Sequence, residues 1–119
     1  MTQAGCANSN NWDQCFAPVF KTLEGVFEDV VPYRSNVPSF VSCWGFVMAR
    51  KGGDGVGLVD AEEVDRRIEE AKPAFKEGKD YEHFDGVAWV AMRSLEKVIR
   101  KGLMEETRVI TEENPVYMF

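Results

Sequence analysis

The chain has 119 residues, enough for one small domain, and hydrophobic residues make up 45% of it, so a packed core can form. Charged residues make up 29% and the net charge is −6. This composition argues against disorder and against a nucleic-acid partner, because an acidic chain repels phosphate backbones. Acidity suits cationic ligands such as amines, although many proteins without such ligands are equally acidic.

The cysteines and the histidine argue against disulfide and metal chemistry. Cys6, Cys15 and Cys43 are odd in number and match no zinc or redox spacing, which favours reduced thiols in a cytoplasmic compartment, with an organelle left open. His83 is the only histidine, so a metal site is not expected. The sequence shows neither a secretory signal nor an apolar run long enough to span a membrane.

Apolar residues at spacings of three and four predict a first helix over Trp12–Phe27. Pro18 interrupts the pattern, so the helix either kinks there or begins near Phe16 with the proline in its first turn. Two strands are predicted next, over Val30–Asn36 and Cys43–Arg50. The second is a continuous apolar run, as expected of a strand that is buried on both faces.

Two connections differ in character. Val37–Ser42 contains no tight-turn dipeptide and is expected to form a shaped loop, of the kind that often holds ligands at strand ends. Lys51–Gly57 contains four glycines, but their spacing fits neither the dinucleotide pattern nor the Walker pattern. A surface connection is therefore the favoured interpretation.

A second helix is predicted over Ala61–Ala71, with Asp60 and Glu63 as a capping pair and Pro73 as its terminator. It is mostly charged, so it should lie on the surface. Apolar periodicity predicts a third helix over Val87–Met104.

Outside these helices, Lys72–Glu82 is interpreted as a polar loop. A short β-like piece is expected at Arg108–Thr111, followed by an apolar ending, Val116–Phe119, that should pack on the body.

The order helix, strand, strand, then helices is typical of the last part of a doubly wound sheet. We therefore expect an α/β fold: the carboxyl-terminal portion of a Rossmann-like, methyltransferase-type sheet with trailing helices. Residues 1–119 would form a single partial domain. The parallel strands that should come first in such a sheet are not in this sequence.

Several segments, in the correct order, resemble the polyamine aminopropyltransferases, and most of all the carboxyl-terminal part of plant-type thermospermine synthase. They are the strand end Thr2–Gly5, the loop Val37–Phe40, the strand Trp44–Ala49, the helix Asp65–Glu70 and the segment Glu105–Pro115 with its Thr-Glu-Glu-Asn-Pro signature.

The resemblance implies transfer of an aminopropyl group from decarboxylated S-adenosylmethionine to a polyamine. It implies substrate contacts at Gln3, Ser39, Phe40 and Trp44. Gln3 matches a family glutamine near the amine pocket, and Phe40 takes the place of a tyrosine in a Pro-Thr-Tyr-Pro loop. Judged as residues without the resemblance, Gln3 equally fits a strand cap, Trp44 is favoured as a core residue, and Phe40 fits either role.

The glycine-rich nucleotide loop, the acidic ribose ligand and the aspartate-rich catalytic loop of the family are absent from this sequence. We therefore expect no catalytic, cofactor-binding or metal-binding residue in the chain, and catalysis would need a missing nucleotide-binding half. The chain is then a fragment, one piece of a split enzyme, or a shortened non-catalytic homologue that serves as an accessory subunit of a larger assembly. A fragment of another S-adenosylmethionine-dependent methyltransferase is a weaker interpretation. A protein partner is expected in the leading cases.

Overall fold

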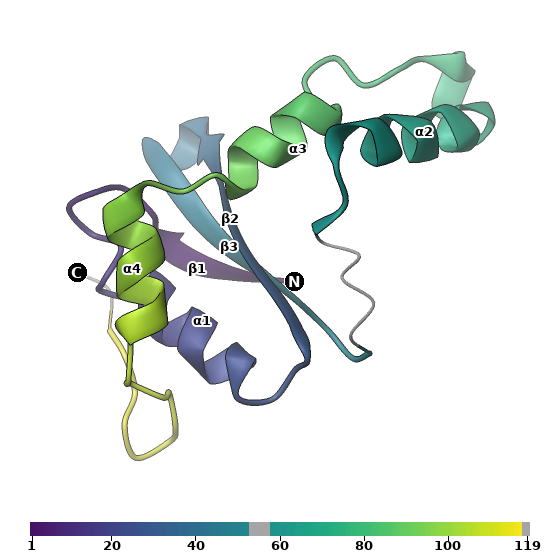
Figure 1. Cartoon of the computed structure of the whole chain (residues 1–119). Helices are drawn as coiled ribbons and strands as arrows, with labels where there is room; N and C mark the ends of the chain where they lie inside the picture. The colour runs from purple at the N-terminus through teal and green to yellow at the C-terminus, as the bar shows by residue number, and fades with distance from the viewer. Residues whose placement is uncertain (53–57, 118–119) are drawn as a thin grey trace.

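The computed structural model describes residues 1–52 and 58–117. It is a mixed α/β structure in which one sheet carries helices on both faces (Figure 1). The α/β class is confirmed, whereas the larger Rossmann-like sheet stays a prediction. Most of the glycine-rich connection falls on residues 53–57, outside the described residues. Within the described ranges, no helix combines the length and apolar character that a membrane crossing requires.

The described strands form one sheet: β1 (Thr2–Cys6), β2 (Asp29–Val37) and β3 (Ser42–Arg50). β3 lies in the middle and runs antiparallel to both neighbours, so β1 and β2 run parallel to each other. β2 and β3 pair in one continuous register, whereas β1 shifts register within its short run. The two strands predicted from the apolar runs and the strand end implied by the family resemblance are confirmed.

One face of the sheet is covered by α1 (Phe16–Glu24), which also contacts α4 (Lys97–Glu105) (Figure 1). α1 begins at Phe16 and carries Pro18 in its first turn, where a missing N–H costs no helical hydrogen bond. Gly45 allows this close packing, since a Cβ there would stand 2.7 Å from the ring of Phe16. The core on this face consists of Ala4, Ala7, Phe16, Ala17, Phe20, Val47, Leu95, Ile99 and Leu103.

The other face is covered by α3 (Gly86–Arg93), against which α2 (Ala61–Ala71) packs (Figure 1). α2 begins as predicted, because the Asp60 carboxylate accepts the backbone N–H of Glu63 at 2.9 Å. It ends just before Pro73, and most of its surface is exposed, also as predicted. The core on this face consists of Val31, Tyr33, Val64 and Trp89.

The predicted single helix over Val87–Met104 is wrong, because α3 and α4 are separate helices with Ser94–Glu96 between them. Ser94 has φ −89° and ψ 76°, and its hydroxyl donates to a backbone carbonyl of the preceding turn at 2.6 Å. The two sides of the break enter different cores: Trp89 packs on the second face and Leu95 on the first. A continuous helix could not reach both faces.

The predicted β-like piece at Arg108–Thr111 is also wrong. This segment is irregular and is held to α1 by a hydrogen bond from the Ile110 N–H to the Thr22 hydroxyl at 2.8 Å. In the described part of the apolar ending, Val116 is partly buried and Tyr117 is 66% exposed. The polar loop Lys72–Glu82 contains two short 3₁₀ turns.

Candidate functional site

The carboxyl ends of β1 and β2 lie at the same edge of the sheet, because the two strands run in the same direction. β1 ends at Cys6 and β2 at Val37. In open α/β sheets, ligands bind outside the carboxyl ends of parallel strands, where the loops leave the sheet. This edge and the adjoining part of the second face form the candidate site.

An aromatic surface lies beside this edge. Tyr33 stacks on Phe46 with ring centroids 5.5 Å apart and planes at 18°. Phe40 packs against Trp44 with centroids 4.5 Å apart and planes at 44°. Tyr33 on β2 and Phe46 on β3 are paired directly across the two strands. Trp44 lies two residues before Phe46 on β3, so its side chain is on the same face, because side chains alternate along a strand. These four rings are called the aromatic surface below; Tyr33 forms its buried base in the core of the second face, and Phe40 is its most exposed ring.

Gln3 borders the aromatic surface. Its Cα partner on β3 is Phe46, and directly paired residues in antiparallel strands point their side chains to the same face. Gln3 is exposed, and its side chain makes no hydrogen bond to a described residue. Its amide therefore offers an acceptor and two N–H donors. The structure thus brings three of the predicted site residues, Gln3, Phe40 and Trp44, to one region.

Ser39 is not brought into this contact. It lies in the 3₁₀ turn Pro38–Phe40, where it is exposed and its hydroxyl makes no hydrogen bond to a described residue. Val41, directly after the turn, has φ 55° and is 91% exposed. A β-branched residue in the left-handed region is a true outlier, and such strain concentrates at functional loops. Substrate binding by Ser39 stays a prediction.

The indole N–H of Trp44 is a buried donor without a hydrogen-bond partner in the described part of the chain. The Tyr33 hydroxyl, by contrast, donates to the sulfur of Met1. Burial raises the pKa of the Tyr33 phenol, so this ring stays neutral at physiological pH. Because a buried N–H without a partner costs free energy, we expect the Trp44 donor to gain one when the site is complete.

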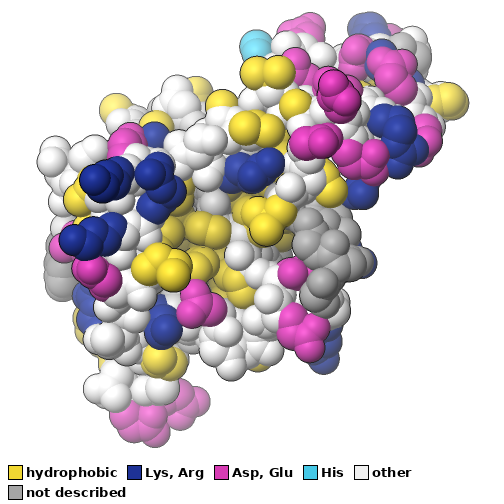
Figure 2. Space-filling model, viewed as in Figure 1, with side chains coloured by type: hydrophobic (Ala, Val, Ile, Leu, Met, Phe, Trp, Pro, Cys, Tyr) yellow, Lys and Arg dark blue, Asp and Glu magenta, His cyan; other side chains and the backbone are white. Residues whose placement is uncertain are grey.

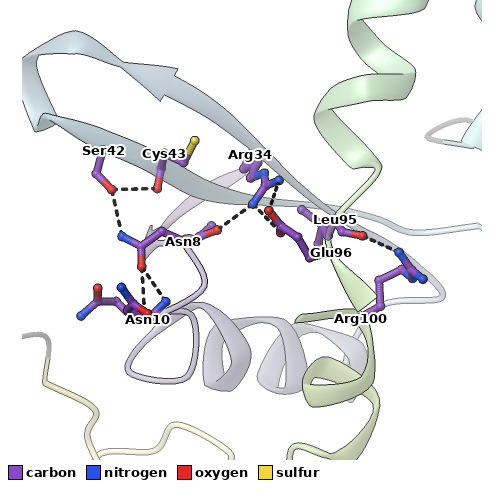
Figure 3. Close-up of polar contacts among 10 residues, drawn as sticks. Asn8, Asn10, Arg34, Ser42, Cys43, Leu95, Glu96 and Arg100 are labelled. Atoms are coloured by element: carbon purple, nitrogen blue, oxygen red, sulfur yellow. Dashed lines mark hydrogen bonds and ion pairs between the residues drawn. The ribbon is translucent and has the colours of Figure 1, made fainter. Parts of the chain in front are cut away.

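A polar frame holds the loops at this edge together (Figure 3). The Asn8 amide nitrogen donates to the Ser42 hydroxyl at 3.2 Å, and the Asn8 amide oxygen accepts the backbone N–H groups of Asn10 and Asn11, both at 3.0 Å. Asn8 therefore closes the turn after β1 and ties it to the first residue of β3. The frame fixes one end of the loop that carries Phe40.

Arg34 of β2 joins this frame to α4 (Figure 3). One of its terminal nitrogens donates to the Ala7 carbonyl oxygen at 3.2 Å, and both form a bidentate pair with Glu96 at 2.6 and 2.7 Å. Hydrogen bonding to Glu96 raises the pKa of Arg34, and hydrogen bonding to Arg34 lowers the pKa of Glu96. Both groups stay charged at neutral pH, so the pair anchors the start of α4 beside the site.

The edge can therefore do two things chemically. Phe40, which is 41% exposed, and the partly buried Trp44 can cover an apolar chain, and the Gln3 amide can exchange hydrogen bonds with a polar end group. Among the described residues, no group of three or more histidine, cysteine, aspartate or glutamate side chains is placed to hold a metal ion.

Comparisons with known proteins agree with the resemblance. Thermospermine synthase ACAULIS5 of Arabidopsis thaliana is 35% identical over 114 residues, which are 96% of this chain and 31% of that protein. A polyamine aminopropyltransferase of Sulfurisphaera tokodaii is 32% identical over 105 residues, 87% of this chain and 32% of that protein. Polyamine aminopropyltransferase 2 of Pseudomonas aeruginosa is 43% identical over 65 residues, 55% of this chain and 18% of that protein.

The chain is homologous to the polyamine aminopropyltransferases. The resemblance found in the sequence is confirmed. The chain spans about a third of the length of the thermospermine synthase and of the Sulfurisphaera enzyme. No family model matches it. We therefore treat the activity, substrates and partners of the complete relatives as proposals for this chain.

Sequence reasoning missed several residues of this edge. Phe46 alternates with buried neighbours on β3, and Tyr33 is itself buried between partly buried neighbours. A period-two pattern could therefore have indicated the faces of both rings, but their pairing required the register. Asn8 lies in a polar stretch without periodicity. Arg34 and Glu96 are 62 positions apart, and no local signal links them.

Proposed function

We propose that the chain forms the amine-side wall of a polyamine aminopropyltransferase of the thermospermine or spermidine synthase kind. In this proposal it is the carboxyl-terminal part of the enzyme and is inactive without a nucleotide-binding half, supplied by another polypeptide or a longer parent chain. One observation carries the proposal: the register pairs Gln3 with Phe46, which sets an exposed amide beside the aromatic surface.

The strand arrangement supports a Rossmann-like sheet that continues beyond β1. β1, α1 and β2 form a parallel strand–helix–strand unit, with β3 inserted antiparallel between the strands. The outer edge of β1 pairs with no described strand, and an open edge is a template for another strand. Further parallel strands of the nucleotide-binding half would pair at this edge.

The proposed contacts follow from the chemistry of a polyamine. The Gln3 amide oxygen accepts an N–H of the amine, and Phe40 and Trp44 cover its methylene chain. Ser39, exposed in the turn that carries Phe40, offers a hydroxyl at the rim. The frame around Asn8 keeps that turn in place.

The reaction requires this part of the site to orient the amine. The amine nitrogen must present its lone pair to the propyl carbon next to the sulfonium of decarboxylated S-adenosylmethionine. A C–N bond forms, the C–S bond breaks, and the sulfur keeps the bonding electrons as a neutral thioether. The amine proton must leave to a base, which in this proposal lies in the other half. A neutral amide such as Gln3 orients the amine and favours its protonated form less than a carboxylate would.

The test is a titration of the chain with spermidine, observed through the side-chain amide NMR signals of its glutamines. The sequence contains two, Gln3 and Gln14, so Gln14, in the turn before α1, serves as an internal control. The Gln3→Leu variant assigns the signals. The proposal predicts a saturable shift of the Gln3 signal, no shift of Gln14, and weaker binding to Phe40→Ala.

Equal shifts at both glutamines, or no shift at Gln3, would contradict the proposed wall. The homology would then reflect common ancestry without a shared activity, as expected of an accessory structural subunit.

A further inference from the structure

A separate hollow, with a volume of about 370 Å³, lies where α1, β2 and α4 meet. Its lining includes Val30, Val31 and Pro32, three consecutive residues of β2. Because consecutive side chains point to opposite faces, the hollow must run along the outer edge of β2. Figure 2 shows hydrophobic side chains gathered in a depression near the middle of the view, with Lys and Arg side chains to its left and above it.

Two arginines line this hollow, and neither forms an ion pair with a described residue. Arg93 donates to the Val59 carbonyl oxygen at 3.0 Å, and its buried Nε has no hydrogen-bond partner in the described ranges. Arg100 donates to the Leu95 carbonyl oxygen at 2.5 Å. Two guanidinium charges without a carboxylate partner among residues 1–52 and 58–117 stand out in a chain of net charge −6.

The rest of the hollow is apolar, and part of it is uncovered. Leu58 and Met104 both line it and are 64% and 78% exposed. Its volume falls within the range of about 300–1,000 Å³ that is typical of small-molecule sites, which combine apolar walls with a few polar groups. Pro32 lacks a backbone N–H and interrupts pairing at this edge, which favours a small ligand over an added strand.

We propose that this hollow binds a small ligand with an apolar body and a carboxylate group. The body fills the space against β2 and α4, and the carboxylate accepts hydrogen bonds from Arg93 and Arg100. Charge-assisted hydrogen bonds from guanidinium to carboxylate are among the strongest in proteins. The lining of the hollow includes neither Gln3 nor any ring of the aromatic surface. This proposal and the proposed amine site can therefore be tested independently of each other.

The probe is octanoate, titrated into the full chain with ¹³C-labelled methionine methyl groups. Met104 lines the hollow, and Met48, which packs on the second face of the sheet, is the internal control. We expect a saturable shift of the Met104 signal and none at Met48. Octan-1-ol has the same chain length without the charge, and it should bind at least about tenfold more weakly.

Arginine variants test the charge. Arg100→Met should weaken octanoate binding about tenfold, whereas Arg66→Met, on α2 and away from the hollow, should not change it. Arg93→Met should act like Arg100→Met, and if it unfolds, the Arg100→Met result decides. The proposal is overturned if octanoate produces no saturable shift at Met104, if octan-1-ol binds equally well, or if Arg100→Met leaves the affinity unchanged.

Discussion

The indole ring of Trp12 lies against Gly102 of α4 so closely that a Cβ at Gly102 would stand 2.0 Å from the ring. This contact joins the segment before α1 to the last helix. A glycine that should weaken a helix is thus the residue that lets the ring approach.

Gly102→Ala should therefore destabilise the protein, although alanine is intrinsically the better helix former. We expect the free energy of unfolding to fall by about 1–3 kcal/mol, because the ring must move. Urea unfolding monitored by circular dichroism measures this. Gly25→Ala is the matched control, because its Cβ would stand at an ordinary 3.6 Å from the nearest atom. A stabilising effect of Gly102→Ala would contradict the packing described.

Leu95 anchors the break between α3 and α4. It is 3% exposed and packs in the core of the first face. Leu95→Ala should lower the free energy of unfolding by about 2–5 kcal/mol, through lost burial and the cavity left behind. Val98→Ala, at a position that is 52% exposed on α4, should cost far less. Equal losses in the two variants would show that Leu95 does not hold the break.

The bidentate pair of Arg34 with Glu96 should contribute to stability. Arg34→Met removes this pair and the bond to the Ala7 carbonyl, so the free energy of unfolding should fall by about 1–2 kcal/mol. Arg66→Met removes exposed pairs with Glu63 and Glu70 and should change stability little, because solvent screens them. Urea unfolding of both variants at one salt concentration compares them.

Glu96 should also make stability depend on pH. The Arg34 guanidinium holds the pKa of this carboxyl below its ordinary value of 4.5, so the charged form favours the folded state. The contribution is present above pH 4.5 and is lost as the pH falls through the lowered pKa. The stability difference between the protein and its Glu96→Gln variant should therefore shrink on acidification.

Unfolding measured from about pH 7 to about pH 3 tests this dependence. Glu112→Gln, at an exposed position without an ion pair to a described residue, is the control. A difference that stays constant over this range would show that Glu96 does not carry it.

Local signals in the sequence were enough for β2, β3 and α2, because the Asp60 cap, Pro73 and the apolar runs act over a few residues, whereas β1 was expected only from the family resemblance. The break at Ser94–Glu96 could not be predicted in this way. Apolar spacing continues across it, while the residues on its two sides belong to opposite faces of the sheet. Only the tertiary structure separates them.

The candidate site, too, could be predicted only in part from the sequence. Gln3, Phe40 and Trp44 were found through a family resemblance, and the structure brings them to one region. Tyr33 and Phe46 complete the aromatic surface, but their contact depends on strand register, which a single sequence does not reveal. The Arg34–Glu96 pair depends on where α4 begins. The sequence did not reveal this start, because the predicted third helix joined α3 and α4 into one.

The central claim is that Gln3 holds the amine. The most direct measurement places this chain in Arabidopsis thermospermine synthase, in exchange for the homologous third, and follows aminopropyl transfer. In an active chimera, Gln3→Leu should raise the KM for the amine at least about tenfold and leave the KM for decarboxylated S-adenosylmethionine unchanged, while Gln14→Leu changes neither. An unchanged amine KM in the Gln3→Leu chimera would contradict the account.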